Sequence, residues 1–291
     1  MTIKGSEVTF GVEIEAYVPR SAEYFNVGRY HMGYQLSNSP RGWNGQADGS
    51  LSSSYVGYKP VEVVSPVLKG FGYDESNPHA DQGLSHLAYM SQILEDSNAK
   101  FDHTTGLHIH IGKPQGWTSQ HDLALAKVFR QHEQAFLALN GKYVVRRLMT
   151  DAYCKASPKW ANLVETGTRY RTLNFKTGSK DTVEFRLFQG TADLETLVTA
   201  VQMCVAVVVK VANMTNQELG TLVPYPQVRS YQTAVYQFIR SFFTNKTKVV
   251  PEARFKEYMQ TALGLAQVAD NTDTQQVYGS AVTVMRLQRG I

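Results

Sequence analysis

The sequence predicts an α+β fold, and three observations lead to this prediction. Segments with the two-residue period of β-strands alternate with helical segments over the first two-thirds of the chain. The last third consists mostly of segments with helical spacing. No fixed-period repeat, low-complexity segment or clear linker divides the chain. Its 291 residues are enough for one large domain. We therefore expect a single domain over 1–291, with the sheet and its motifs in 8–191, helices in 192–268 and a polar tail in 269–291.

The expected elements of the first third follow in order. Strands over 8–18 and 61–65 are each stopped by a proline, which cannot donate a hydrogen bond to a sheet. Between them, residues 20–60 are rich in Gly, Ser, Tyr and Asn, which is typical of loops, with a short strand near Trp43. Apolar residues at helical spacing predict an amphipathic helix over 84–97.

The remaining elements are predicted by stronger patterns. Residues 106–112 alternate strictly, as a strand does, and 118–140 has the capping residues of a long helix. Residues 169–175 and 182–188 predict a strand pair joined by a turn. Further helices are expected over 193–214, 230–243 and 251–267.

Composition and charge exclude several classes of protein. The formal net charge of +4 is too small to indicate a nucleic-acid or membrane surface. Cys154 and Cys204 lack partners at metal-ligand spacing, which excludes a disulfide framework and a thiolate zinc site and fits a reducing cytoplasm. The most apolar run, 197–214, contains Gln202 and Lys210, which favours a buried helix over a membrane span. We expect a cytoplasmic protein without a membrane partner.

Three of the expected strands carry pairs of ionisable residues on one face. Residues i and i+2 of a strand point to the same side, and here apolar residues occupy the other side. An ordinary solvated face mixes Lys, Thr, Ser and Gln, so pairs of this kind together predict a functional site. The residues, with one glutamate on a fourth strand, are Glu13, Glu15, Glu62, His108, His110, Glu184 and Arg186.

These side chains suit metal-dependent phosphate chemistry. Converging carboxylates repel each other unless cations neutralise them. Carboxylate oxygens with an imidazole favour Mg²⁺ or Mn²⁺ over a thiolate type of zinc site. Arginines beside such ions bind phosphoryl groups, and the candidates are Arg169, Arg171 and Arg186. No P-loop or Rossmann fingerprint occurs, so a sheet and its metals would have to hold a nucleotide.

Six stretches, taken in their order along the chain, carry a family resemblance. They are FGVEIEAY (10–17), DGSL (48–51) after Trp43, VEVVSPVLKG (61–70), TGLHIHIG (105–112), RYRTLNF (169–175) and TVEFRLFQGT (182–191). Together they resemble the amidoligase family, a distant branch of the glutamine synthetase and glutamate–cysteine ligase superfamily. The resemblance implies a curved, mainly antiparallel sheet like the glutamine synthetase catalytic domain, with ATP and metals on the concave face and helices on the convex face. It also implies an ATP-dependent carboxylate–amine ligase that forms an amide through an acyl phosphate.

The resemblance further implies roles for single residues. Two or more Mg²⁺ or Mn²⁺ ions would be bound by Glu13, Glu15, Glu62, His108 and Glu184. The nucleotide would contact Arg169, Arg171 and Asn174, although Asn174 serves equally well as a turn cap and the choice between the two arginines stays open. Catalysis would involve Arg171 at the transferring phosphoryl group, Arg186 at the reacting carboxylate, and His110. Substrate contacts would come from Asp48, His110 and Arg186.

Substrates and alternatives are less closely defined. By analogy, the carboxylate is glutamate or glutamate-like, on a small molecule, a peptide or a modified macromolecule. Some amidoligases occur in phages, so we expect an enzyme of a bacterial cytoplasm or of a phage-infected one; the oligomeric state stays open. The alternatives are a phosphotransferase like the guanidino kinases, a non-catalytic nucleotide- or metal-binding module, and a zinc-dependent hydrolase.

Overall fold

The computed structural model describes most of the chain. The described residues are 3–25, 33–36, 42–51, 55–69, 82–144, 164, 170–178, 180–221, 230–242 and 252–276. Arg169 and Cys154 lie outside them, as does most of the expected polar tail.

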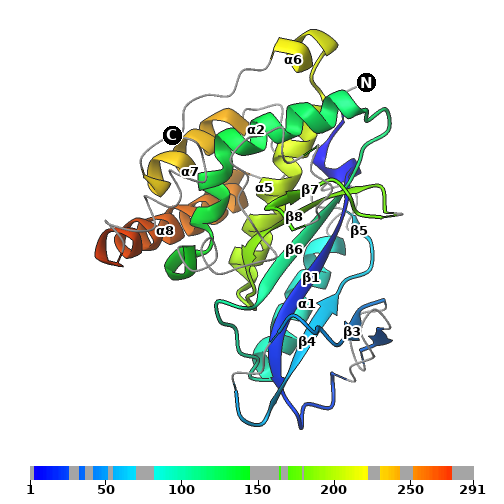
Figure 1. Ribbon diagram of the computed structural model, residues 1–291, viewed down its shortest axis with the longest axis vertical. Helices are drawn as coiled ribbons and strands as arrows, with labels where there is room; N and C mark the ends of the chain where they lie inside the picture. Colours follow the sequence, from blue (N-terminus) through cyan, green and yellow to red (C-terminus); the bar gives the residue numbers. More distant parts are fainter. Residues whose placement is uncertain are drawn as a thin grey trace.

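One sheet lies beside a layer of helices (Figure 1). Its strands are β1 (Thr9–Pro19), β2 (Tyr34–Gln35), β3 (Asn44–Gln46), β4 (Tyr58–Val64), β5 (Leu68–Lys69), β6 (Gly106–Gly112), β7 (Leu173–Asn174) and β8 (Thr182–Gln189). Their order is β2-β3-β4-β1-β6-β8-β7, and β5 pairs with the beginning of β1. Each described strand pair is antiparallel. The long strands β1, β4, β6 and β8 therefore lie next to one another.

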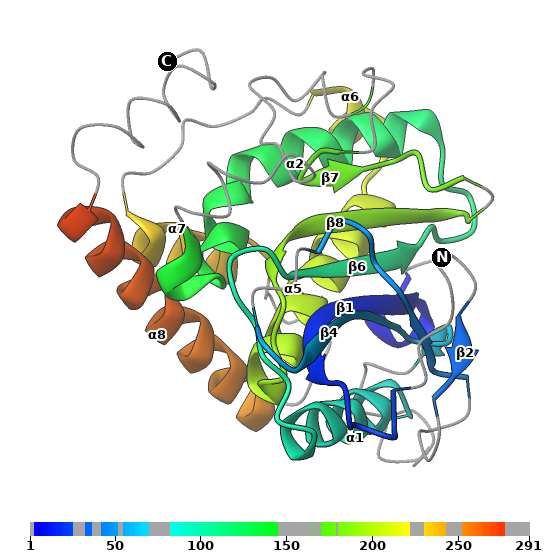
Figure 2. The ribbon, with the colours of Figure 1, turned by 60° about the horizontal axis from the view of Figure 1, so that its bottom comes forward.

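Helices pack on one face of this sheet in two layers. They are α1 (Gln82–Asp96), α2 (Ser119–Ala138), α5 (Leu194–Ala212), α6 (Asn216–Thr221), α7 (Tyr231–Phe242) and α8 (Glu252–Gln276), with short 3₁₀ turns at Gly5–Glu7 and Gly141–Tyr143. Helices α1, α2 and α5 contact strands, whereas α7 and α8 pack against α2 and α5 farther from the sheet (Figure 2). The predicted fold class, a mainly antiparallel sheet with helices on one face and a mostly helical last third, is confirmed.

The hydrophobic core lies between the sheet and the helices. The apolar residues that alternate with the ionisable pairs, such as Ile14, Ile109 and Phe185, are fully buried there. Helix α5 passes through this core, and its first turn is capped by Asp193, whose carboxylate accepts a hydrogen bond from the Thr196 N–H at 2.8 Å. By length and composition α5 alone among the described helices could cross a membrane, but 78% of its apolar window is buried inside the protein. A core helix accounts for this observation.

Two predicted elements differ from the observed ones. Helix α8 continues to Gln276, beyond the expected end at 267, because no Gly or Pro interrupts residues 265–278 and polar residues are tolerated on an exposed helix. Of the strand expected over 169–175, the described part contains only the two residues of β7. That strand lies at the edge of the sheet, where only one neighbour supplies hydrogen bonds.

Candidate active site

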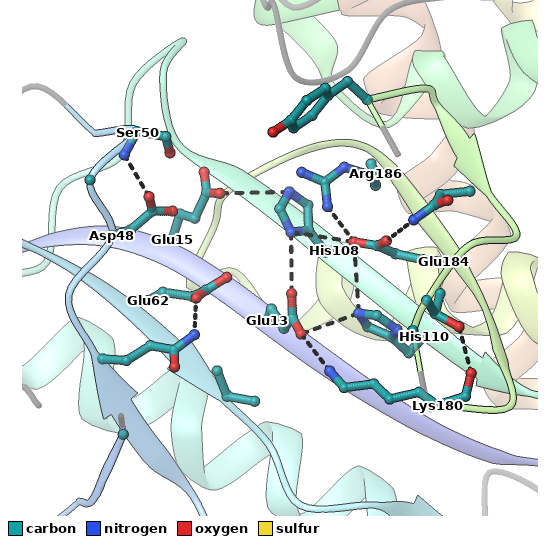
Figure 3. A pocket seen from close by; sticks show the side chains of 18 of the residues that line it. Glu13, Glu15, Asp48, Ser50, Glu62, His108, His110, Lys180, Glu184 and Arg186 are labelled. Atoms are coloured by element: carbon teal, nitrogen blue, oxygen red, sulfur yellow. Dashed lines mark hydrogen bonds and ion pairs between the residues drawn. The ribbon is translucent and has the colours of Figure 1, made fainter. Parts of the chain in front are cut away.

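A cavity of about 870 Å³ opens on the face of the sheet that the helices do not cover (Figure 3). Its floor is formed by β1, β4, β6 and β8, and its walls by the loop after β3 and the turn between β7 and β8. Among the residues that line it are Glu13, Glu15, Asp48, Glu62, His108, His110, Asn174, Glu184 and Arg186. Nine side chains singled out in the sequence thus share one cavity.

Antiparallel register brings the ionisable pairs together. Glu13 lies opposite His108 across β1 and β6, and Glu15 lies opposite Glu62 across β1 and β4. His110 lies opposite Glu184 across β6 and β8. Because cross-strand neighbours on one face are only about 5 Å apart, this register is enough to concentrate the charged groups.

A bulge adjusts the register at the centre of the site. Between Leu107 and Ile109 the pairing of β6 with β8 shifts, so that Arg186 and Leu187 of β8 lie opposite the single residue His108. Bulges re-aim side chains beside functional sites. Here Arg186 remains on the cavity side, while Leu187 is fully buried in the core.

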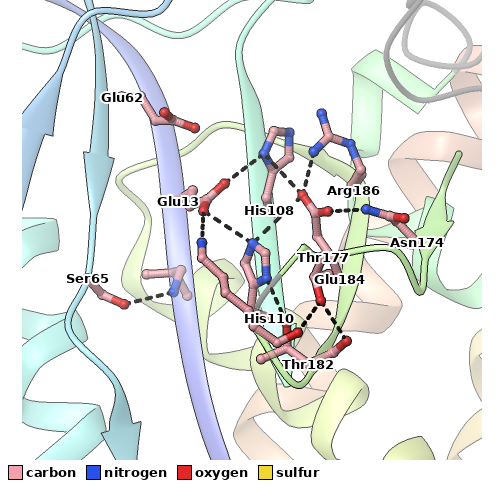
Figure 4. Close-up of polar contacts among 12 residues, drawn as sticks. Glu13, Glu62, Ser65, His108, His110, Asn174, Thr177, Thr182, Glu184 and Arg186 are labelled. Atoms are coloured by element: carbon pink, nitrogen blue, oxygen red, sulfur yellow. Dashed lines mark hydrogen bonds and ion pairs between the residues drawn. The ribbon is translucent and has the colours of Figure 1, made fainter. Parts of the chain in front are cut away.

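His108 lies between two groups of carboxylates (Figures 3 and 4). Its Nδ1 is 3.4 Å from Glu13 Oε2 and 3.8 Å from Glu184 Oε1. Its Nε2 is 3.6 Å from Glu15 Oε1, on the side of Glu62. The potential ligand atoms of Glu13, His108 and Glu184 all lie within 4.8 Å of one another, and so do those of Glu15, Glu62 and His108. The two triads share one imidazole, and their oxygen and nitrogen donors fit Mg²⁺ or Mn²⁺.

Neighbouring polar groups hold the carboxylates in place. The Gly106 backbone N–H donates to Glu15 Oε2 at 2.5 Å, and the Gln46 amide donates to Glu62 Oε2. The Asn174 amide donates to Glu184 Oε2 at 2.7 Å, and the Arg186 guanidinium donates to Glu184 Oε1. Such contacts orient ligands before a metal binds.

Charge pairing inside the cluster offsets the cost of burial for two glutamates. Burial alone would raise the pKa of Glu13, but hydrogen bonds from His108 and His110 and their positive charge hold it well below its usual value. Burial likewise opposes ionisation of Glu184, and the charges of Arg186, His108 and His110 lower its pKa. Repulsion between carboxylates, expected from the sequence, is therefore largely compensated at these two residues.

At Glu62 and His108 the protein surroundings raise the pKa. Burial and the negative charge of Glu13 raise the pKa of Glu62 to about 7. Burial and Arg186 disfavour protonation of His108, yet the hydrogen bond to Glu13 and the charges of Glu15 and Glu184 raise its pKa overall. Metal ions bind the deprotonated forms of these two side chains, so ion binding would compete with their protonation.

The structure does not bring together all of the predicted site residues. Arg171 is described but is not among the residues that line the cavity, and Arg169 lies outside the described residues. Asp48 lines the cavity, where its Oδ1 accepts a hydrogen bond from the Ser50 N–H at 2.7 Å in a local turn. Trp43 is fully buried and donates its indole N–H to His86 Nδ1 at 3.3 Å, so it packs in the core and does not line the cavity.

Several residues of the cavity escaped the sequence analysis. Gln46 orients Glu62, and Lys176 and Lys180 reach the cavity from the turn between β7 and β8. Tyr170 also lines the cavity and is the one Phe, Tyr or Trp side chain among its described lining residues. Gln46 lies two residues before Asp48, and both lysines lie within eight residues of Glu184, so proximity to the motifs was the available signal.

Comparison with known proteins supports the fold. Neither family models nor curated proteins match this chain. Among solved structures, it is similar to a bifunctional glutathione synthetase from Pasteurella multocida, with a TM-score of 0.50 and 12% identity over 98% of this chain. The match spans 52% of that synthetase, about half its length. A complex of GmaS with ADP matches with a TM-score of 0.39 and 11% identity, over 97% of this chain and 68% of the other. The match to the synthetase shows a similar fold.

Proposed function

We propose that this protein is an ATP-dependent carboxylate–amine ligase of the amidoligase type. The observation that carries the proposal is the pair of metal-ligand triads joined by His108 on one face of an antiparallel sheet. Six motifs in family order support the same assignment, as does the similarity of the fold to a glutathione synthetase. A non-catalytic binding module would need fewer of these groups.

The donor atoms of the site fit two divalent cations. Glu13, His108 and Glu184 would hold one Mg²⁺ or Mn²⁺, and Glu15, Glu62 and His108 surround the place for another. Bound ions of this kind neutralise phosphate oxygens and polarise the bond to the leaving group.

The side chains of the protein would bind and orient the two substrates. In the proposed reaction a carboxylate oxygen would attack the γ-phosphorus of ATP and release ADP. The amine nitrogen would then attack the acyl carbon, and loss of inorganic phosphate and of a proton from the nitrogen would give the amide. Arg186 lines the cavity, and its guanidinium donates a hydrogen bond to Glu184. The planar guanidinium has further N–H donors, and a pair of them suits a substrate carboxylate. His110 lies beside it, with Nε2 3.2 Å from Glu13 Oε1 and Nδ1 3.2 Å from Thr182 Oγ1. We propose that His110 contacts the acyl phosphate.

The cavity volume sets the scale of the substrates. About 870 Å³ falls within the usual range for small-molecule sites, and the lining is mixed polar and charged. We propose a glutamate-like carboxylate as the acyl donor and a compact amine as the acceptor. As part of the same proposal, the protein is a single domain and acts in the cytoplasm, as the sequence predicts.

Two measurements test the proposed function. Mg²⁺ together with a non-hydrolysable ATP analogue should raise the melting temperature, because a ligand that binds only the folded state stabilises it. A screen of amino acids paired with amines should then show ADP release that requires both members of a pair, with the amide detected by mass spectrometry. An unmoved melting temperature and no heat of binding would contradict the nucleotide assignment. ADP formation without any amine would favour the phosphotransferase instead.

A further inference from the structure

The two oxygens of the Glu13 carboxylate face different partners. Oε2 faces His108, whereas Oε1 lies 3.3 Å from Lys180 Nζ and 3.2 Å from His110 Nε2 (Figure 3). Lys180 comes from the turn between β7 and β8, and nothing in the sequence motifs drew attention to it. Its ammonium thus occupies the coordination space of a carboxylate that belongs to the first metal-ligand triad.

A divalent ion and this ammonium compete for the same carboxylate. An ion held by Glu13, His108 and Glu184 would add two positive charges where Lys180 and Arg186 already neutralise the two glutamates. Positive charges at such short separation repel strongly in a site with limited solvent. Withdrawal of one of the two cations would relieve this repulsion, so the ion would bind more tightly once one of them moves away.

Exposure identifies Lys180 as the cation that withdraws. Its side chain is 57% exposed, whereas that of Arg186 is only 12% exposed and lies against Glu184 in the floor of the cavity. An exposed ion pair of a long flexible side chain contributes little free energy and is easily exchanged. Lysine has four rotatable bonds, so its ammonium can leave Glu13 while its backbone stays in place.

Two hydrogen bonds join Thr177 and Lys180 across the turn that carries the lysine. The Thr177 hydroxyl donates a hydrogen bond to the Lys180 carbonyl oxygen at 2.6 Å, and the Lys180 N–H donates to the Thr177 carbonyl oxygen at 3.3 Å. Gly178 within it has a φ of +68°, which favours glycine. Figure 4 shows Thr177 and Thr182 next to His110 at this end of the site. A side chain displaced from Glu13 therefore remains over the cavity and does not leave with its turn.

We propose that Lys180 exchanges between Glu13 and the phosphates of the nucleotide. In the metal-free site its ammonium neutralises Glu13, and once a divalent cation binds, it moves onto the polyphosphate that this cation chelates. The inference rests on the proposed function and adds a phosphate-binding residue to it. Lys180 thereby lowers the affinity for metal alone and raises the affinity for metal with nucleotide, so the site favours the complete pair.

The test compares Lys180→Met with Lys176→Met by calorimetry, using Mn²⁺ alone and Mg²⁺ with a non-hydrolysable ATP analogue. Lys176 is a matched control, because it lines the same cavity from the same turn and has no carboxylate at ion-pair distance among the described residues. Lys180→Met should bind Mn²⁺ alone roughly 3- to 10-fold more tightly and the metal–nucleotide pair roughly 3- to 10-fold more weakly. Lys176→Met should leave the affinity for Mn²⁺ alone within about twofold of wild type.

The outcomes separate the inference from the proposed function. If wild type binds no nucleotide, both are overturned. If wild type binds it and Lys180→Met shifts both affinities in the same direction, or shifts neither, the exchange is overturned and the ligase proposal stands. Equal shifts in Lys176→Met also overturn the exchange, because they show a general effect of cavity charge. Lys180→Gln repeats the measurement with a polar side chain, and melting temperatures show that each variant is folded.

Discussion

Both faces of the sheet bury side chains, but different partners stabilise them. On β8, Phe185 is fully buried against the helices, and its neighbour Glu184 is only 4% exposed on the cavity side. Phe185 packs 5.8 Å, between ring centroids, from both Phe129 and Phe136, so its contribution is apolar burial. Glu184 is kept ionised by Arg186, His108 and Asn174. Burial alone therefore does not separate core from site; the kind of partner does.

The largest effect should come from Glu184→Gln. The change keeps the shape but removes the charge that the metal triad needs, so we expect turnover to fall by more than about 100-fold. Arg186 and His108 favour the ionised carboxylate, so we also expect the metal-free protein to lose about 1.5–3 kcal/mol of stability. This differs from an expectation based on carboxylate repulsion alone, under which stability would stay equal or rise. Steady-state rates and urea unfolding measure the two effects, and near-normal turnover would remove Glu184 from the site.

Phe185→Ala tests the other face at the adjacent residue. The lost ring leaves a cavity between β8 and α2, and we expect a loss of about 3–5 kcal/mol of stability. The fraction of the variant that stays folded should bind metal with nearly unchanged affinity, because Phe185 does not line the active-site cavity. If Phe185→Ala weakened metal affinity as much as Glu184→Gln does, the separation of the two faces would be contradicted.

The arginines give a smaller and more selective effect. Arg186→Lys should raise KM for the carboxylate about 30- to 150-fold, since one charge-assisted contact contributes about 2–3 kcal/mol. Arg171→Lys should lower kcat if Arg171 contacts the phosphoryl group, as the resemblance implies. Because Arg171 does not line the cavity, we expect the fold-change in kcat of Arg171→Lys to be smaller than the fold-change in KM of Arg186→Lys. A tenfold or greater loss of kcat in Arg171→Lys would restore its catalytic role.

A buried histidine in the helical layer should produce an effect that appears only at acidic pH. Burial, with a contribution from Lys210, lowers the pKa of His132 to about 4, and its ring packs against Phe238 and Phe242. Between about pH 6.5 and 4 the unfolded chain binds a proton that the folded chain excludes, so stability falls as pH falls. The difference reaches at most about 3 kcal/mol.

His132→Phe isolates this contribution. The substitution keeps an aromatic ring at the packing position and removes the titration, so the variant should lose less stability than wild type between pH 6.5 and 4. Urea unfolding at several pH values measures both proteins, and parallel pH profiles would show that His132 does not contribute.

The sequence by itself determined the strands and the faces of their residues. Strict alternation at 106–112 and 182–188 placed His108, His110 and Glu184 on one face of their strands and the buried apolar residues on the other face, because a strand has a period of two. The same rule separated Glu13 from Ile14. Helices were readable for a similar reason, since apolar spacing of 3.6 follows directly from helix geometry.

Only the tertiary structure decided which strands are neighbours. Periodicity carries no information about pairing, so the contact of Glu15 with Glu62 and the sharing of His108 between two triads depend on the order β4-β1-β6-β8 and on the bulge at His108. The same is true of Lys180, whose turn reaches Glu13 from 167 residues away. Alternation is local in the chain, whereas register, bulges and turns arise from long-range packing. This is why most of the charged residues that line the cavity could be singled out from the sequence, but their partners could not.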